Sequence, residues 1–180
     1  MVYLFLADGF EEIEALAVVD ILRRAELPVS TVAIKERLLI KGAHDIKVEA
    51  DMLLEDIDSE NIDALILPGG MPGTLHLGQE ARLKQLILDS NKKGVLIGAI
   101  CAAPSILGES NMLIGKDAVC YPGYEEQLLG ANILYEKVAV SDNIVTSRGA
   151  GTAMEFGYKL VELLKDKQTS DKLRKSMIAE

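Results

Sequence analysis

The sequence has few of the residues that cross-link small proteins through disulfides or metal ions. Its 180 residues include only two cysteines and two histidines. It has no Cys-x-x-Cys motif and no pair of histidines at helical spacing, so the spacing predicts no metal site, and we expect no cofactor. A chain of this length buries about 70% of its surface on folding and needs no such cross-link.

Positive charge and long apolar runs are also scarce. The formal net charge is −9, and an acidic surface repels nucleic acid and anionic membranes. No run approaches the roughly 18 apolar residues of a membrane span. The first residues, "MVYLFLADGF", turn acidic too early for an export signal. We therefore expect no nucleic-acid or membrane partner, and a cytoplasmic protein whose thiols are reduced.

Short apolar runs alternate with helical patterns along the chain. Most of the runs lack polar alternation, which is typical of parallel strands covered on both faces. We predict strands over residues 2–7, 29–34, 63–69, 95–100 and 143–148, and long helices over 11–27, 80–94 and 151–166. This alternation predicts one doubly wound α/β domain over residues 1–180.

Three further segments differ from this pattern. Residues 36–54 alternate apolar and polar side chains around Lys41-Gly42, which predicts a β-hairpin with its turn there. Residues 116–122 and 133–142 are expected to form inserted or edge strands.

Four strand ends carry polar or glycine-rich sequences: "ADGFEEIE", "LPGGMPGT", "AICAAP" and "TSRGAGT". Ligands of such sheets bind beyond the carboxyl ends of the strands, where the loops meet. We therefore expect these four segments to share one site.

Cys101 follows a predicted strand and precedes helix-forming residues, a junction that exposes nucleophiles in hydrolases. A helix beginning at Ala102 would direct its amides at the sulfur and lower the pKa of the thiol. The alternative is that Cys101 only fills space, because free cysteine is among the most buried residue types. The residues themselves leave both interpretations open.

Two further groups at this edge also allow two interpretations. The amide of Gly70, in "LPGGMPGT", either stabilises an oxyanion or belongs to a plain turn. Glu14 either interacts with the amino-terminal end of its helix, or is buried with a raised pKa and shares a proton with the thiol. Neither histidine follows Cys101, so a Cys-His-acid triad with a downstream base is excluded.

Taken together, "ADGFEEIEA", "LPGG", "AICAAPSIL" and "TSRGAGTAMEF" resemble the ThiJ/PfpI superfamily, in the branch of the parkinsonism-associated protein deglycase and its bacterial relatives. The resemblance extends from Val2 to about Lys165. It implies a flavodoxin-like or class I glutamine-amidotransferase-like three-layer sandwich with a mostly parallel central sheet. It also implies a homodimer.

The resemblance assigns roles to residues of this chain. The nucleophile of the family falls on Cys101, and its protonated acidic partner falls on Glu14. The oxyanion-hole amides fall on Gly70 and Ala102.

The lining of the family pocket falls on Gly69, on Tyr121 and His44, and on the loop containing Gly149 and Gly151. An arginine from the neighbouring subunit matches Arg24, which implies a dimer interface at the first helix.

Two of these positions depart from the family pattern. Tyr121 stands where glyoxalase and deglycase members often have histidine, and a phenol is a poor base at neutral pH. His44 replaces a second arginine of the site. The sequence Cys101-Ala102-Ala103 also differs from the Cys-His-Gly of the proteolytic branch, so we do not expect a protease.

These features lead to three hypotheses. The first is an enzyme whose cysteine acts on reactive dicarbonyls such as methylglyoxal, or on their early adducts with protein side chains. The second is a redox-responsive stress or chaperone protein whose cysteine is oxidised to sulfinate. The third, which the name of the superfamily implies, is a role in thiazole monophosphate biosynthesis. The other cysteine, Cys120, is expected to be buried.

Overall fold

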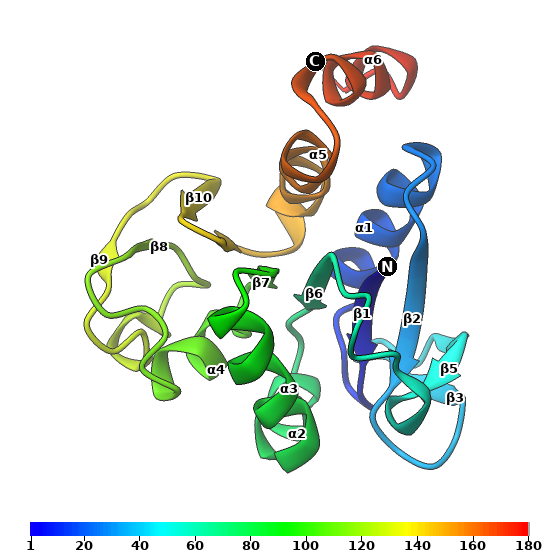
Figure 1. The fold of residues 1–180 in the computed structure, drawn as a ribbon, viewed down its shortest axis with the longest axis vertical. Helices are drawn as coiled ribbons and strands as arrows, with labels where there is room; N and C mark the ends of the chain where they lie inside the picture. Colours follow the sequence, from blue (N-terminus) through cyan, green and yellow to red (C-terminus); the bar gives the residue numbers. More distant parts are fainter. Residues whose placement is uncertain (180) are drawn as a thin grey trace.

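A seven-stranded sheet forms the centre of the computed structural model, which describes residues 1–179 (Figure 1). The strand order is β10-β11-β7-β6-β1-β2-β5, and every neighbouring pair is parallel except β10 and β11. The strands are β1 (Val2–Leu6), β2 (Val29–Ala33), β5 (Met52–Leu53), β6 (Ala64–Leu67), β7 (Leu96–Ile100), β10 (Val138–Ser141) and β11 (Ile144–Ser147). The predicted, mostly parallel sheet is confirmed.

Helices cover both faces of this sheet (Figure 1). One face carries α1 (Glu12–Arg24) and α5 (Ala153–Leu164), with α6 (Lys167–Ser176) packed on α5. The other face carries α2 (Gly73–Gln79), α3 (Ala81–Lys92) and α4 (Pro104–Glu109). Short 3-10 turns are η1 (Leu54–Asp56), η2 (Glu125–Gln127) and η3 (Ala150–Thr152). The predicted three-layer sandwich is confirmed.

The side chains of β1 show why its sequence is apolar throughout. Leu4 and Leu6 belong to the core cluster under α1 and α5, whereas Tyr3 and Phe5 belong to the cluster under α3 and α4. Successive residues of a strand point to opposite faces, so a strand covered on both faces needs apolar residues at every position.

The predicted hairpin is present, but its turn is longer than predicted. Strands β3 (Leu39–Lys41) and β4 (Lys47–Glu49) pair antiparallel in a sheet of their own. Residues 42–46 form the connecting loop, so the turn does not lie at Lys41-Gly42. The predicted strands at 116–122 and 133–142 are reduced to a short parallel pair, β8 (Asp117–Ala118) and β9 (Asn132–Ile133), and to the edge strand β10.

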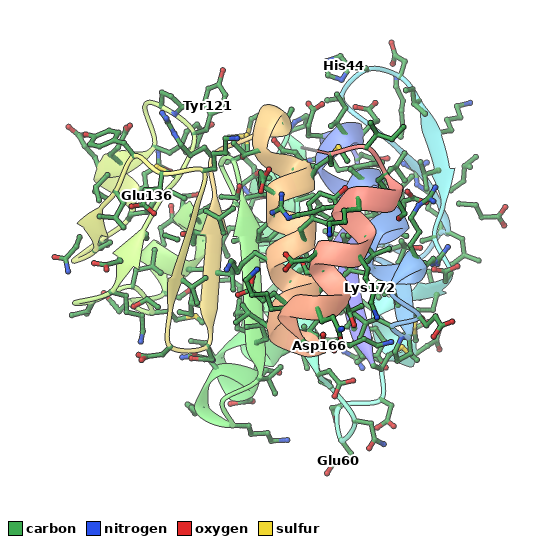
Figure 2. All side chains as sticks on the ribbon, turned by 90° about the horizontal axis from the view of Figure 1, so that it is seen from above. His44, Glu60, Tyr121, Glu136, Asp166 and Lys172 are labelled. Carbon is green, nitrogen blue, oxygen red and sulfur yellow. The ribbon has the colours of Figure 1, made fainter. Side chains whose placement is uncertain are left out.

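The carboxyl ends of the parallel strands all lie at one end of the molecule, as predicted. Figure 2 shows His44 and Tyr121 at this end and Glu60 at the opposite end. Among residues 1–179, no helix combines the length and the apolar character that crossing a membrane would require.

Candidate active site

Cys101 stands at a sharp bend between β7 and α4. Its φ of +66° lies in the left-handed region, which costs a residue other than glycine about 1–2 kcal/mol. Two backbone hydrogen bonds hold the bend: the Cys101 N–H donates to Ser147 O at 2.9 Å, and its carbonyl accepts from Tyr121 N–H at 2.8 Å. Cys101 is partly exposed, so solvent reaches this residue.

The helix after Cys101 begins later than predicted. Residues 101–103 form a turn, and α4 starts at Pro104, which suits the first turn of a helix because proline has no N–H to satisfy there. The sulfur therefore faces the amides of a turn and not the end of a long helix.

Glu14 lies in the first turn of α1 with only 1% of its surface exposed. Its Oε2 accepts a hydrogen bond from Gly69 N–H at 2.8 Å, and its carboxyl hydrogen-bonds the Cys101 thiol. Its other oxygen, Oε1, is buried without a hydrogen-bond partner among residues 1–179. Burial raises the pKa of Glu14 to about 7, against the smaller opposing effect of these two hydrogen bonds. Of the two interpretations of Glu14, the structure supports burial with a raised pKa.

The thiol of Cys101 is shifted in the direction opposite to the prediction. Burial, followed by the charge of Glu14, raises the pKa of Cys101 to about 12. Backbone amides of Ala102 and Gly70 donate to the sulfur and lower the pKa by less. The predicted low pKa of Cys101 is therefore wrong when Glu14 is ionised. The sequence alone does not show how far folding buries the thiol, and burial is what raises its pKa.

The effect of Glu14 depends on its own proton. An ionised carboxylate repels a thiolate, whereas a protonated carboxyl is neutral and donates a hydrogen bond to it. Cys101 and Glu14 thus titrate as one pair, and the sulfur is ionised when the remaining proton sits on Glu14.

The glycines of "LPGG" allow this close approach. A Cβ on Gly69 would lie 2.6 Å from the Cβ of Cys101 and 2.7 Å from Oε2 of Glu14. Gly70 has a φ of +91°, and a Cβ there would lie 2.3 Å from the backbone nitrogen of Glu11. The amides of Gly70 and Ala102 both donate to the sulfur, so they lie beside the place where an oxyanion would form on a carbon bound to that sulfur.

The rim of the site includes Tyr121 and the loop after β11. Tyr121 is 51% exposed. A Cβ on Gly149 would lie 3.3 Å from Cδ2 of Tyr121 and 3.8 Å from Oε1 of Glu14, so the Gly149 backbone lies between them. A Cβ on Gly151 would meet no atom within 4 Å, so this position faces open space.

Within one chain, Arg24 and His44 make no hydrogen bond or ion pair with Cys101 or Glu14; Arg24 is expected at the site only of a neighbouring subunit. Arg24 pairs with Asp20, Nε to Oδ2 at 2.7 Å, near the far end of α1 and about 15 Å along the helix from Glu14. His44 contacts Glu12 and, at 3.8 Å, Glu11, and it hydrogen-bonds neither Cys101 nor Glu14. The side-chain hydrogen bond to Glu12, followed by the charges of Glu11 and Glu12, raises the pKa of His44.

Arg148 was not predicted for the site. It lies between Ser147, which holds the Cys101 amide, and Gly149, and its charge lowers the pKa of Cys120. Cys120 is 4% exposed, as predicted, and burial raises its pKa to about 11.

Two hollows of the surface lie away from this site. One, of about 550 Å³, lies between Lys35 and Arg82, and the other, of about 510 Å³, lies beside Lys41 and Pro72. Neither is lined by Cys101. The bend at Cys101 is nevertheless the stronger candidate, because the nucleophile, the acid and the amide donors meet there.

The chain is similar to known proteins over most of its length. The DJ-1/PfpI family profile matches residues 1–163. The Arabidopsis thaliana protein DJ-1 homolog B is 38% identical over 165 residues, which are 91% of this chain but only 38% of that protein's length. The glutathione-independent glyoxalase DJ-1 of Schizosaccharomyces pombe is 33% identical and covers 98% of this chain and 97% of its own. The solved structure titled "Toxoplasma gondii DJ-1, oxidized" has a TM-score of 0.94 at 34% identity, over 98% of this chain and 97% of that one.

Proposed function

Because this chain belongs to the DJ-1/PfpI family, we propose that it is a cysteine-dependent enzyme of the glyoxalase or deglycase type. Its substrates are reactive dicarbonyls such as methylglyoxal, or their early adducts with protein side chains. The observation that carries this proposal is that the Cys101 thiol hydrogen-bonds both the carboxyl of Glu14 and the amides of Gly70 and Ala102. The glyoxalase name of the Schizosaccharomyces pombe relative supports the same reaction class.

The first step is addition of the Cys101 thiolate to the aldehyde carbon. A sulfur–carbon bond forms, and the π electrons of the carbonyl move to its oxygen. The amides of Gly70 and Ala102 donate to this oxyanion, and Glu14 gives it a proton to form a hemithioacetal.

The later steps need no outside oxidant or reductant. The Glu14 carboxylate takes the proton from the former aldehyde carbon and returns it to the neighbouring carbon. The proton of the hemithioacetal hydroxyl moves to the oxygen of that neighbouring carbon, which becomes a hydroxyl, and the former aldehyde carbon regains a carbonyl. This transfer leaves a thioester on Cys101. Water then cleaves the thioester to a 2-hydroxy acid and restores the thiol, so the net reaction of methylglyoxal adds one water and yields lactate.

Lactate formation from methylglyoxal by the purified protein tests this proposal. We expect wild type to form lactate and Cys101→Ser to form none. Cys120→Ala, which removes the other thiol, serves as the matched control and retains activity. Equal rates for wild type and Cys101→Ser would overturn the proposal.

A second candidate function is oxidation sensing. Among residues 1–179, Glu14 Oε1 is buried beside the site without a partner, and the similar solved structure from Toxoplasma gondii is described as oxidized. A thiolate that attacks peroxide gains one oxygen and releases water, and a second peroxide gives the sulfinate. Protonated Glu14 would donate a hydrogen bond to a sulfinate oxygen. Intact mass after mild peroxide should show two added oxygens on Cys101, and earlier oxidation of Cys120 would contradict this function.

The proposal also covers assembly and location. We propose a single-domain protein that forms homodimers through α1, where Ile13 is 57% and Leu16 is 37% exposed. In such a dimer, Arg24 of one copy would lie near the site of the other. A cytoplasmic location accords with the free thiols of Cys101 and Cys120.

A further inference from the structure

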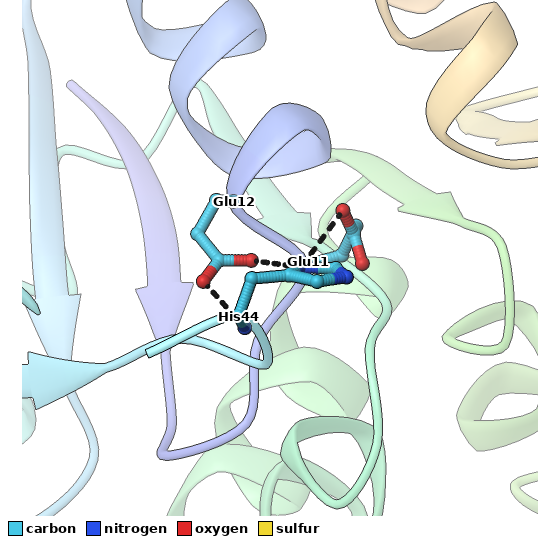
Figure 3. Close-up of side chains that lie close together, drawn as sticks. All are labelled: Glu11, Glu12 and His44. Carbon is cyan, nitrogen blue, oxygen red and sulfur yellow. Dashed lines mark hydrogen bonds and ion pairs between the residues drawn. The ribbon is translucent and has the colours of Figure 1, made fainter. Parts of the chain in front are cut away.

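A separate group of potential ligand atoms lies beside the amino-terminal end of α1, formed by Glu11, Glu12 and His44 (Figure 3). The glutamates come from the start of the helix, and His44 comes from the loop between β3 and β4. His44 Nδ1 lies 2.8 Å from Oε2 of Glu12 and 3.8 Å from Oε1 of Glu11. The three side chains place one donor atom each within 4.8 Å of one another.

Glu11 is the poorly compensated carboxylate of this group. The side chain of Glu12 is only 6% exposed and that of Glu11 only 17%, while that of His44 is 68% exposed. Even a protonated imidazole would leave the group with one excess negative charge. Within residues 1–179, the Glu11 carboxylate makes no hydrogen bond, and its one ionic neighbour is His44. A carboxylate withdrawn from water without a hydrogen bond is costly, and a bound cation would offset that cost.

The backbone already holds these donors in place. The N–H of His44 donates to Oε1 of Glu12 at 2.7 Å, and the N–H of Ala43 donates to the carbonyl of Phe10 at 2.8 Å. The loop is thereby fixed against the segment that enters α1, so binding would require movement of side chains only.

We propose that Glu11, Glu12 and His44 bind a divalent transition-metal ion of the zinc type. Zinc takes carboxylate and imidazole ligands at about 2.0–2.2 Å, which places two donors on one ion roughly 3–4 Å apart. The observed separations approach this geometry. Three protein ligands would leave a fourth position for water or for a small anionic ligand.

Metal-binding motifs in the sequence do not reveal this site, because its ligands come from the start of a helix and from a loop distant in the sequence. The proposal does not depend on the carbonyl chemistry of Cys101.

Zinc titration calorimetry of the full chain at neutral pH tests the proposal. Wild type should bind one equivalent of Zn²⁺, and His44→Gln and Glu11→Gln should each weaken binding at least about tenfold. His76→Gln removes the only other histidine, whose Nδ1 lies 2.9 Å from the Asp8 carbonyl, and should bind like wild type. Cys101→Ser should also bind like wild type, which separates this site from the thiol.

Diffraction from zinc-soaked crystals provides a second test, in which the anomalous peak should lie among the side chains of Glu11, Glu12 and His44.

Three outcomes would overturn the proposal: no saturable zinc binding by wild type, equal affinity of wild type and His44→Gln, or an anomalous peak at Cys101. Each would mean that Glu11, Glu12 and His44 form only an ion-paired cluster. The test uses Glu11 and His44 rather than Glu12, because Glu12 also holds the loop backbone through His44 N–H. Circular dichroism of each variant checks that it is folded.

Discussion

Cys101 combines a strained backbone with a buried, proton-sharing neighbour. Its φ of +66° aims the thiol into the space between Gly69 and Glu14. A left-handed conformation in a residue other than glycine persists only where the surrounding structure enforces it, and such positions are common at functional sites. The strain and the pairing with Glu14 each lead to a measurement on single residues.

The backbone strain at Cys101 predicts that glycine is more stable than alanine at this position, the reverse of the usual order. Cys101→Gly should be more stable than Cys101→Ala by about 1 kcal/mol, because only alanine keeps the penalty of the left-handed conformation. Urea denaturation measures this difference. Cys120, which is not among the residues with positive φ, is the control, and there glycine should be the less stable of the two. The same order at both positions would refute strain at Cys101.

The raised pKa of Glu14 predicts how stability depends on pH. The folded pKa of about 7 lies above the ordinary 4.5, so this contribution is complete below pH 4.5 and is lost as the pH rises through 7. Between about pH 5.5 and about pH 8, the free energy of unfolding of wild type should fall by about 2 kcal/mol relative to Glu14→Gln. Denaturant titrations of both proteins provide the comparison, and a pH-independent difference would show that Glu14 is not protonated in the folded state.

At the scale of elements, the sequence predicts most of the fold but less of the site. Apolar runs mark β1, β2, β6, β7 and β11 to within one residue at their starts, because strands covered on both faces have few polar positions. The start of α4 and the turn of the β3–β4 hairpin were misplaced, because backbone hydrogen bonds to distant segments fix them. The residues left the pairing of Cys101 with Glu14 as one of two interpretations, and the family resemblance selected it. The Glu11, Glu12 and His44 cluster was not predicted.

The loop after β6 predicts a sharp contrast between two glycines of the site. Gly69→Ala should abolish lactate formation, because its Cβ would lie 2.6 Å from the Cβ of Cys101 and 2.7 Å from Oε2 of Glu14. Gly151→Ala should retain activity, because its Cβ would meet no atom within 4 Å. Steady-state kinetics with methylglyoxal compare the two variants. Full activity of Gly69→Ala would mean that the close approach of Glu14 to Cys101 is not required.

For the whole molecule, the exposed apolar residues of α1 predict self-association. Wild type should have the mass of a dimer in light scattering, and Ile13→Glu should be a monomer, because a charge replaces a side chain that is 57% exposed. Leu75→Glu on α2, where leucine is 53% exposed, is the matched control and should remain dimeric. A monomeric wild type, or a dimer that persists in Ile13→Glu, would exclude this interface.

The claim on which the proposed chemistry depends is that Cys101 and Glu14 share one proton. The direct measurement is the rate of Cys101 alkylation as a function of pH. In wild type, if the remaining proton of the pair sits on Glu14, the rate should rise below the ordinary thiol pKa of about 8.5 and then level off. In Glu14→Gln the rise should move to higher pH by at least about one unit, because glutamine cannot accept the proton of the thiol. Identical profiles for the two proteins, both rising only above about pH 9, would contradict the account.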